Sequence, residues 1–206
     1  MAGARSSFAR VCAKQRSWMV DQQRITTKAS TVMFFRKLFL ATLLVSLGSP
    51  LWAQDCHLEA RASTPTERFK VHADGTITDT KTRLTWMRCS VGMHWKDGNC
   101  VDVAVQYEWK DAGRFITRLN DDEGYAGYKD WRLPTLKELE EIVEHRCINP
   151  AINLEVFPAT LPSGYWSSTP DKDYKKGAWL VFFLHGKSYM GNVQQAWKLR
   201  LVRDAQ

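Results

Sequence analysis

The chain has 206 residues, a hydrophobic fraction of 44% and a formal net charge of +7 at pH 7. The positive charge is concentrated near the start, because residues 1–53 hold eight Lys and Arg against one Asp. Residues 54–206 carry 21 basic and 21 acidic side chains and are neutral overall. Since affinity for nucleic acid depends on basic side chains that neutralise phosphates, this balance argues against nucleic acid as a partner.

Residues 33–53 have the parts of a secretory signal peptide. A short basic start precedes an apolar run at 38–47, and the polar end closes on Ala53, after which we expect cleavage. The apolar run is shorter than the about 20 residues that span a bilayer, so we expect no transmembrane span in the mature chain. We interpret residues 1–32 as a disordered extension or as residues upstream of a true start at Met33. The mature protein is therefore predicted to be periplasmic or extracellular.

The mature chain has the usual size of one domain. We expect residues 54–66 to form an N-terminal tail and residues 67–206 to form a single domain. Several short segments have the alternation or composition typical of strands, and they are 69–72, 76–78, 84–88, 165–168, 178–184, 188–193 and 199–203. Two helices are predicted between the two groups of strands. This order indicates an α+β fold built on antiparallel sheets.

Apolar residues at helical spacing mark the first helix, and they are Trp109, Ala112, Phe115, Ile116 and Leu119. The second helix begins at Thr135, and its apolar stripe consists of Leu136, Leu139, Ile142 and Val143. The motif that opens it consists of Trp131, Arg132, Leu133, Pro134, Thr135 and Glu138. Thr135 and Glu138 have the spacing of a capping box, in which each side chain accepts a hydrogen bond from the other residue's backbone. We interpret the motif as structural, because it turns a strand into a capped helix.

Four cysteines follow the predicted signal, namely Cys56, Cys89, Cys100 and Cys147. An even number of cysteines in an exported chain predicts disulfides, and four cysteines allow three pairings. The glycines between Cys89 and Cys100 suit a turn that returns one cysteine to the other. This favours a Cys89–Cys100 bridge and leaves Cys56 to tether the N-terminal tail to Cys147.

No metal site, cofactor site or catalytic motif is predicted. The cysteines lack the close ligand spacing of zinc modules. Residues 121–123 could supply oxygen ligands to Ca²⁺, but consecutive acids in a turn usually point in different directions, and we favour a solvated loop. Walker, dinucleotide-binding and nucleophile-elbow motifs are not found in the sequence, so we expect a protein that is not an enzyme.

A set of short motifs resembles the Lcl C-terminal domain family, which is named for a bacterial collagen-like adhesin. The motifs cover nearly all of 67–203 and lie at 74–79, 84–89, 130–135, 149–153, 157–158, 165–168 and 200–203. The resemblance implies an exported bacterial domain, and the name-giving member binds sulfated glycans and trimerises through its collagen-like stalk. This chain has no Gly-X-Y repeat, so the resemblance leaves its oligomeric state open.

A more distant likeness is to the C-type-lectin-like fold and to the formylglycine-generating enzymes that share it. It implies antiparallel sheets with two helices, here stapled by disulfides. Those enzymes carry a reactive cysteine pair late in the chain, whereas no cysteine follows Cys147. The calcium-ligating Glu-Pro-Asn and Trp-Asn-Asp triplets of sugar-binding C-type lectins are also missing from the sequence. The likeness therefore implies a fold. It implies neither cysteine-dependent oxidase activity nor calcium-dependent sugar binding for this chain.

Candidate ligand contacts come from tryptophan and lysine. Trp95, inside the segment between Cys89 and Cys100, and Trp197 are predicted to be exposed, and aromatic faces bind sugar rings and cations. Residues 165–206 hold seven basic against three acidic side chains. The lysines that we expect to attract sulfate or carboxylate groups there are Lys172, Lys175, Lys176, Lys187 and Lys198. The alternative is a solvated loop with ordinary strand-edge lysines.

The sequence therefore predicts an exported, non-enzymatic binding domain that recognises glycan, such as a sulfated polysaccharide, or another anionic polymer at the cell envelope. The alternative is a structural or assembly component of an envelope or fimbrial complex, with an envelope protein as its partner. An oxidase of the formylglycine-generating type is disfavoured by the missing cysteines.

Overall fold

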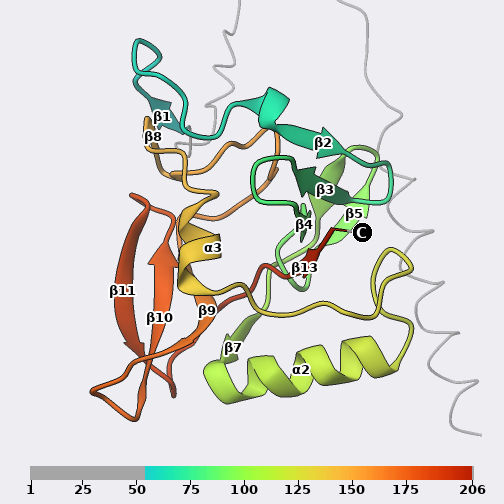
Figure 1. Cartoon of the computed structure of the whole chain (residues 1–206), viewed down its shortest axis with the longest axis vertical. Helices are drawn as coiled ribbons and strands as arrows, with labels where there is room; N and C mark the ends of the chain where they lie inside the picture. The colour runs from blue at the N-terminus through green and yellow to red at the C-terminus, as the bar shows by residue number, and fades with distance from the viewer. Residues whose placement is uncertain (1–53, 206) are drawn as a thin grey trace, which may run out of the picture. The chain divides into compact units, whose positions relative to one another are not determined.

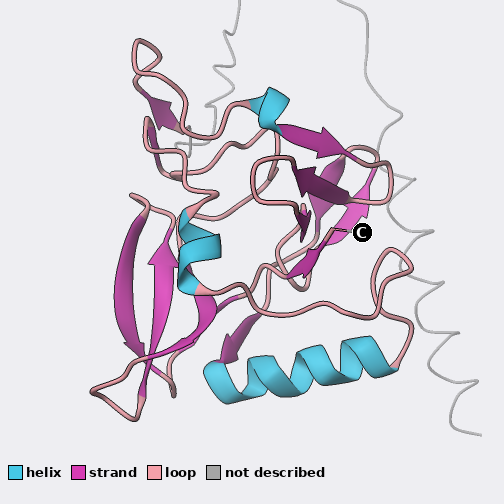
Figure 2. Cartoon of the chain, in the orientation of Figure 1, coloured by secondary structure: helices cyan, strands magenta, loops and turns pink. Residues whose placement is uncertain are grey.

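A computed structural model describes residues 54–205, and the predicted signal peptide at 33–53 and the extension at 1–32 lie outside the described residues. Within the described part, short strands, two α-helices and one short 3-10 helix (Thr66–Arg68) are joined by extensive loops (Figure 2). The strands form separate small sheets, and nearly all pairings are antiparallel. The predicted α+β class is confirmed.

The first sheet has four strands in the order β13-β4-β3-β2. Its members are β2 (Phe69–Val71), β3 (Thr76–Asp79), β4 (Leu84–Met87) and β13 (Val202–Asp204), and all three pairings are antiparallel. The turn from β2 to β3 is made by Asp74 and Gly75. The Asp74 carboxylate accepts hydrogen bonds from the backbone N–H and the hydroxyl of Thr76, and Gly75 adopts a φ of +83°, which favours glycine.

The second sheet has five strands in the order β11-β10-β9-β12-β7. They are β7 (Gln106–Glu108), β9 (Gly164–Pro170), β10 (Gly177–Phe182), β11 (Lys187–Asn192) and β12 (Ala196–Lys198). The pairing of β12 with β9 is parallel and brings Lys198 beside Tyr165, while the others are antiparallel. Figure 1 shows this sheet at the lower left, with β13 and its neighbours in a separate layer.

The predicted strand at 199–203 is wrong in its bounds, because the chain crosses between the two sheets there. It leaves β12 at Lys198 and enters β13 at Val202. Between them, the carbonyls of Leu199 and Leu201 accept hydrogen bonds from the backbone N–H groups of Val91 and Met87. The connection therefore finds its backbone partners in the segment after β4.

Helix α2 (Trp109–Asp121) and helix α3 (Leu136–Glu140) are the two α-helices of the described part. The capping box of α3 is present: the Thr135 hydroxyl accepts from the Glu138 N–H at 3.3 Å, and the Glu138 carboxylate accepts from the Thr135 N–H at 2.7 Å. The helix is shorter than its apolar stripe suggested. After Glu140 the chain turns, and Val143 forms a β-bridge with Ile152.

The buried side chains form two clusters, one on each side of the five-stranded sheet. The first joins the four-stranded sheet, α3 and the loop that contains Phe157, and it includes Trp86, Leu139 and Tyr165. The second lies between the sheet and α2, and it includes Trp131 and Trp166. The tryptophans of the strand-like segments, which are Trp86, Trp131, Trp166 and Trp179, are expected to build the core. This is confirmed for the first three, each at most 1% exposed, whereas Trp179 in β10 is only half-buried.

Both predicted disulfides are present. Cys56–Cys147 joins β1 (Asp55–Cys56) to β8 (Cys147–Ile148), and the two strands are paired antiparallel. Cys89–Cys100 ties the segment after β4 to β6 (Asn99–Val101), which forms a hairpin with β5 (His94–Lys96). The glycine-containing segment between Cys89 and Cys100 does fold back as its composition suggested.

The N-terminal tail is also held by the buried carboxylate of Glu144, which is 2% exposed. The carboxylate accepts hydrogen bonds from the backbone N–H groups of Ser63, Thr64 and Arg146. It also accepts from the side-chain hydroxyls of Ser63 and Thr64. Burial opposes ionisation, but these hydrogen bonds outweigh it and hold the pKa of Glu144 below its ordinary value of 4.5. The anion therefore contributes to stability.

Replacement of Glu144 by Gln should make stability less dependent on pH. Because the pKa of Glu144 is lower in the folded than in the unfolded chain, its contribution is complete above the ordinary value and is lost as the pH falls through the folded value. We expect the free energy of unfolding of E144Q to be about 1–3 kcal/mol lower than that of wild type at pH 7. Urea unfolding from about pH 7 to pH 3 should show wild type and E144Q converging, whereas a constant difference would contradict this account. E123Q, at an exposed position, is the control.

Candidate functional site

One face of the five-stranded sheet carries an open groove of about 300 Å³, which we call the aromatic groove. Its lining residues are Leu180, Phe182, His185, Tyr189, Met190, Gly191, Gln195 and Trp197. Strand register explains this gathering, because side chains of directly opposed residues project to the same face of a sheet. Leu180 lies opposite Tyr189, and Phe182 lies opposite Lys187.

Phe182 is the centre of the aromatic groove. Its ring centroid lies 5.8 Å from that of Trp197 and 6.4 Å from that of Tyr189, both edge to face. The His185 ring lies 5.7 Å away and is tilted. These arrangements are favourable for aromatic pairs and hold the rings in fixed orientations. Because Tyr189 is 44% exposed, the groove is open to a ligand.

Two glycines let the aromatic rings lie close to the strands. A Cβ atom on Gly164 would lie 2.8 Å from the Trp197 ring, and one on Gly191 would lie 2.7 Å from Leu180 and 2.8 Å from Trp166. Any larger residue would push these rings away from the sheet. The glycines therefore set the depth of the aromatic groove.

The polar groups of the aromatic groove form a short chain of hydrogen bonds. The backbone N–H of Lys187 donates to Nδ1 of His185 at 3.3 Å, and Nε2 of His185 lies 3.2 Å from the Tyr189 hydroxyl. The side-chain oxygen of Gln195 accepts from the backbone N–H of Asn192 at 3.1 Å. His185 and Gln195 are thus held by the backbone of the turns around β11.

The structure does not bring the predicted lysines together. Lys172, Lys175 and Lys176 lie on the exposed turn between β9 and β10, whereas Lys187 starts β11 at the opposite end of the hairpin. The separation along β10 is about 17 Å at the usual rise per residue. A single basic face that contains all of them is therefore not formed.

Lys198 is a correction to the sequence-based prediction. It is 7% exposed, and its ammonium group lies 3.5 Å from the carbonyl oxygen of Ala104. Burial lowers the pKa of Lys198 below its ordinary value. The sequence could not show this, because the neighbouring Trp197 turns outward while Lys198 follows the alternation of β12 into the protein.

Trp95 is also less open than predicted. It lies in β5, and its indole N–H donates to the carbonyl of Ala73 at 3.0 Å. One face of its ring is covered by the guanidinium of Arg88, 4.2 Å from the ring centroid, and its base packs on Gly75. The tryptophan therefore fastens the β5–β6 hairpin to the β2–β3 turn, and its stacking surface is partly used within the protein.

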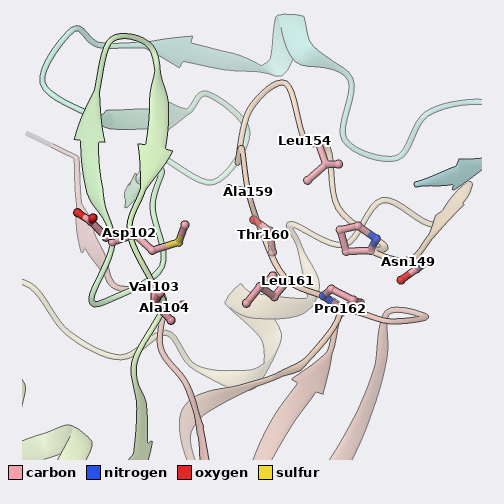
Figure 3. Close-up of a pocket in the computed structure, with 11 residues that line it drawn as sticks. Asp102, Val103, Ala104, Asn149, Leu154, Ala159, Thr160, Leu161 and Pro162 are labelled. Carbon is pink, nitrogen blue, oxygen red and sulfur yellow. The ribbon is translucent and has the colours of Figure 1, made fainter. Parts of the chain in front are cut away.

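A second hollow, the apolar cleft, has a volume of about 460 Å³ and lies between the β6–β7 connection and the long loop after β8. Figure 3 shows Leu154 and Leu161 facing Val103 and Ala104 across it. Val103 is 78% exposed and Leu161 is 39% exposed. The Thr160 hydroxyl donates to the carbonyl of Phe157 and accepts from Arg200, so it is already engaged. The cleft thus suits an apolar group.

Two further features concern metals and membranes. The described residues include no group of three or more side chains placed to hold a metal ion, and residues 121–123 belong to no such group. Between residues 54 and 205, the structure has no helix with the length and apolar character needed to span a membrane.

Comparison with known proteins gives a family. Residues 75–203 match the model of the Lcl C-terminal domain, which covers more than half of the chain. None of the curated proteins matches the chain. Such a domain is typical of adhesin-like or envelope-associated proteins, and the two disulfides are consistent with export. The chain belongs to the Lcl C-terminal domain family.

Proposed function

We propose that this domain is a non-enzymatic binding module of the cell envelope that recognises glycan or a related anionic polymer through the aromatic groove. The observation that carries the proposal is the cluster of Phe182, Tyr189 and Trp197 on an open sheet face. Aromatic rings offer large apolar faces with few rotatable bonds, which suits the apolar face of a sugar ring. The volume of about 300 Å³ lies at the lower end of the range for small-molecule sites.

The chemistry of the lining supports binding without catalysis. Among the described residues that line the aromatic groove, none is a carboxylate or a cysteine. His185 accepts at one ring nitrogen from a backbone N–H and contacts Tyr189 at the other, so both nitrogens are engaged. A general acid paired with a nucleophile or base is the usual requirement for glycoside chemistry. The groove offers positioning groups instead.

Replacement of Trp197 by Ala should weaken glycan binding at least about tenfold, which corresponds to a loss of about 1.4 kcal/mol. A glycan array probed with the mature domain should show bound glycans for wild type and loss of the same signals for W197A. Circular dichroism should confirm that the variant is folded, and Y189A provides a second test at a 44% exposed position. Y174A, on the β9–β10 turn and outside the lining residues of the groove, is the control and should bind as wild type does.

Unchanged binding by both W197A and Y189A would contradict a role for the aromatic groove. The absence of any bound glycan for the folded wild-type domain would contradict the proposed function as a whole. These two results separate the position of the site from the class of ligand.

The apolar cleft favours a second candidate function, in which the domain is an assembly component of an envelope or fimbrial complex. Val103, at 78% exposure, is a large apolar side chain on the rim of a hollow with few free polar groups. Such surfaces mark protein interfaces. A native envelope protein that cross-links to a probe placed at Val103, and not to a probe at Tyr174, would favour this candidate.

A further inference from the structure

The proton positions in the aromatic groove follow from one backbone contact. Because the N–H of Lys187 donates to Nδ1 of His185, that nitrogen must be the acceptor of a neutral imidazole, and the ring proton is on Nε2. Nε2 then donates to the oxygen of Tyr189, 3.2 Å away. The hydroxyl proton of Tyr189 is consequently not used by His185 and is available to a ligand.

Two other groups around the groove are donors as well. Gln195 accepts from the Asn192 backbone through its oxygen, and its NH₂ group donates to no residue in the described part of the chain. Lys187 lies opposite Phe182 on the groove face, is exposed, and forms no ion pair within residues 54–205. One formal positive charge and two neutral donors therefore surround the aromatic rings.

Acidic side chains are kept away from this face. The nearest one along β11 is Glu140 of α3, which accepts a hydrogen bond from the Ser188 hydroxyl. Ser188 lies opposite Val181, which is buried against the α3 side of the sheet, so Glu140 serves the other face. The aromatic groove thus combines an apolar platform with one ammonium group and two neutral donors, and no carboxylate is among its described lining residues. This complements an acceptor group that carries a single negative charge.

We propose that the aromatic groove binds a single pyranose ring that carries one carboxylate, with the ring packed in the corner between the Trp197 and Phe182 side chains and the carboxylate held by Tyr189 and Lys187. This inference rests on the proposed glycan-binding function. A carboxylate has two oxygens and one charge, which matches one hydroxyl donor and one ammonium. A polysulfated chain would instead need several cations side by side, and the hairpin separates Lys187 from Lys172, Lys175 and Lys176.

In this arrangement His185 is a positioning residue. It does not contact the ligand itself and acts through Tyr189, because its Nε2–H donates to the Tyr189 oxygen and leaves the hydroxyl proton of Tyr189 to donate to the ligand. Loss of His185 would free the hydroxyl to rotate and to act as donor or acceptor. The result would be a loss of preference for the acid over the neutral sugar, rather than a loss of all binding.

The test is an NMR titration of the mature, ¹⁵N-labelled domain that follows the indole N–H signal of Trp197. Glucuronate, glucose and glucose 6-sulfate are the probes. Wild type should bind glucuronate about tenfold or more tightly than glucose, a preference of about 1.4 kcal/mol, and more tightly than glucose 6-sulfate. Y189F, K187Q and H185N should each reduce the preference for glucuronate over glucose several-fold.

Matched variants separate local from general effects. Y174F removes a hydroxyl from an exposed tyrosine on the far turn, and K110Q removes a lysine from the exposed side of α2. Both should retain the wild-type preference. W197A should lose the binding of glucuronate and glucose alike, because the stacking platform serves both.

Several results would overturn the inference. Equal affinity for glucuronate and glucose, both dependent on Trp197, would contradict the acid-binding site and leave the glycan-binding function standing. Tighter binding of glucose 6-sulfate would assign the groove to sulfate. Binding of glucuronate that is unaffected by W197A, Y189F and K187Q would place the acid elsewhere on the domain.

Discussion

Replacement of Arg200 by Ala should lower the free energy of unfolding by about 3–5 kcal/mol, which is in the range for disruption of a buried polar network. Arg200 is 0% exposed. Its guanidinium donates to the carbonyls of Met87 and Arg88 and to the hydroxyls of Thr160 and Ser90. The variant would leave these acceptors buried without their donor and would open a cavity.

Two opposing effects decide the size of this loss. No carboxylate among the described residues pairs with Arg200, and burial lowers its pKa to about 10, so burial of the charge itself costs stability at pH 7. Against this stand the hydrogen bonds and the stacking of the guanidinium over Phe157, at 4.9 Å, and Tyr165, at 5.8 Å. We expect the lost contacts to dominate, since several acceptors are orphaned at once.

Urea unfolding of wild type, R200A and R200M measures the balance. R200M keeps most of the side-chain volume and removes the hydrogen bonds, so it should lose less than R200A. R114A, at a side chain that is 62% exposed, is the control and should change stability by at most about 0.5 kcal/mol. A loss below about 1 kcal/mol for R200A would contradict the central structural role of Arg200.

The two disulfides should differ in what their removal costs. Cys56–Cys147 closes a separation of 91 residues, and Cys89–Cys100 closes one of 11. In the chain-entropy account, the longer loop corresponds to roughly 4.5 kcal/mol of stability and the shorter one to roughly 3 kcal/mol. The double variant C56A/C147A should therefore be less stable than C89A/C100A.

Urea unfolding of the two double variants, each lacking two sulfur atoms, makes the comparison. In C56A/C147A the tail retains the hydrogen bonds to Glu144 and those from Gln54 to the carbonyls of Pro150 and Ile152. The tail should thus stay ordered in the folded state, and the loss should arise largely from the unfolded chain. A greater loss of unfolding free energy for C89A/C100A would contradict this prediction and show that the Cys89–Cys100 bridge contributes more to stability.

Local signals in the sequence predicted the parts of the fold that depend on neighbours along the chain. The capping box of Thr135 and Glu138 needs residues three apart, and it is present in the structure. The pairing of Cys89 with Cys100 needs one turn, and it is also present. Arg132 joins this motif to the final strand, because its guanidinium bonds both Glu138 and Asp204.

Properties that depend on strand register could not be predicted in the same way. The sequence offered Trp197 and Lys187 as ligand contacts, and the structure places both on the face of the aromatic groove. Phe182, His185 and Tyr189 were missed, because the register of the β10–β11 hairpin decides which residues of the two strands share a face, and alternation along each strand does not give that register. The depth of the groove depends on Gly164 and Gly191, whose importance appears only once the Trp197 and Leu180 side chains are packed against them.

Burial removes from the surface some of the basic side chains that the sequence assigned to it. Lys198 and Arg200 belong to the basic C-terminal segment by sequence, yet they are 7% and 0% exposed. Lys198 alternates with Trp197 in β12 and so points inward, and Arg200 lies in the connection that crosses between the sheets. The net charge of a segment therefore overstated the charge that a ligand can reach.

The most direct test of glycan binding in the aromatic groove is a map of the binding surface by ¹H–¹⁵N NMR. In this experiment the tightest-binding glycan from the array is added to the mature domain. We predict that the largest shifts lie in the aromatic groove, at Phe182, His185, Tyr189 and the Trp197 indole. Shifts confined to the apolar cleft around Val103 and Leu161, or to the lysine turn at 172–176, would contradict the assignment of the glycan site to the aromatic groove.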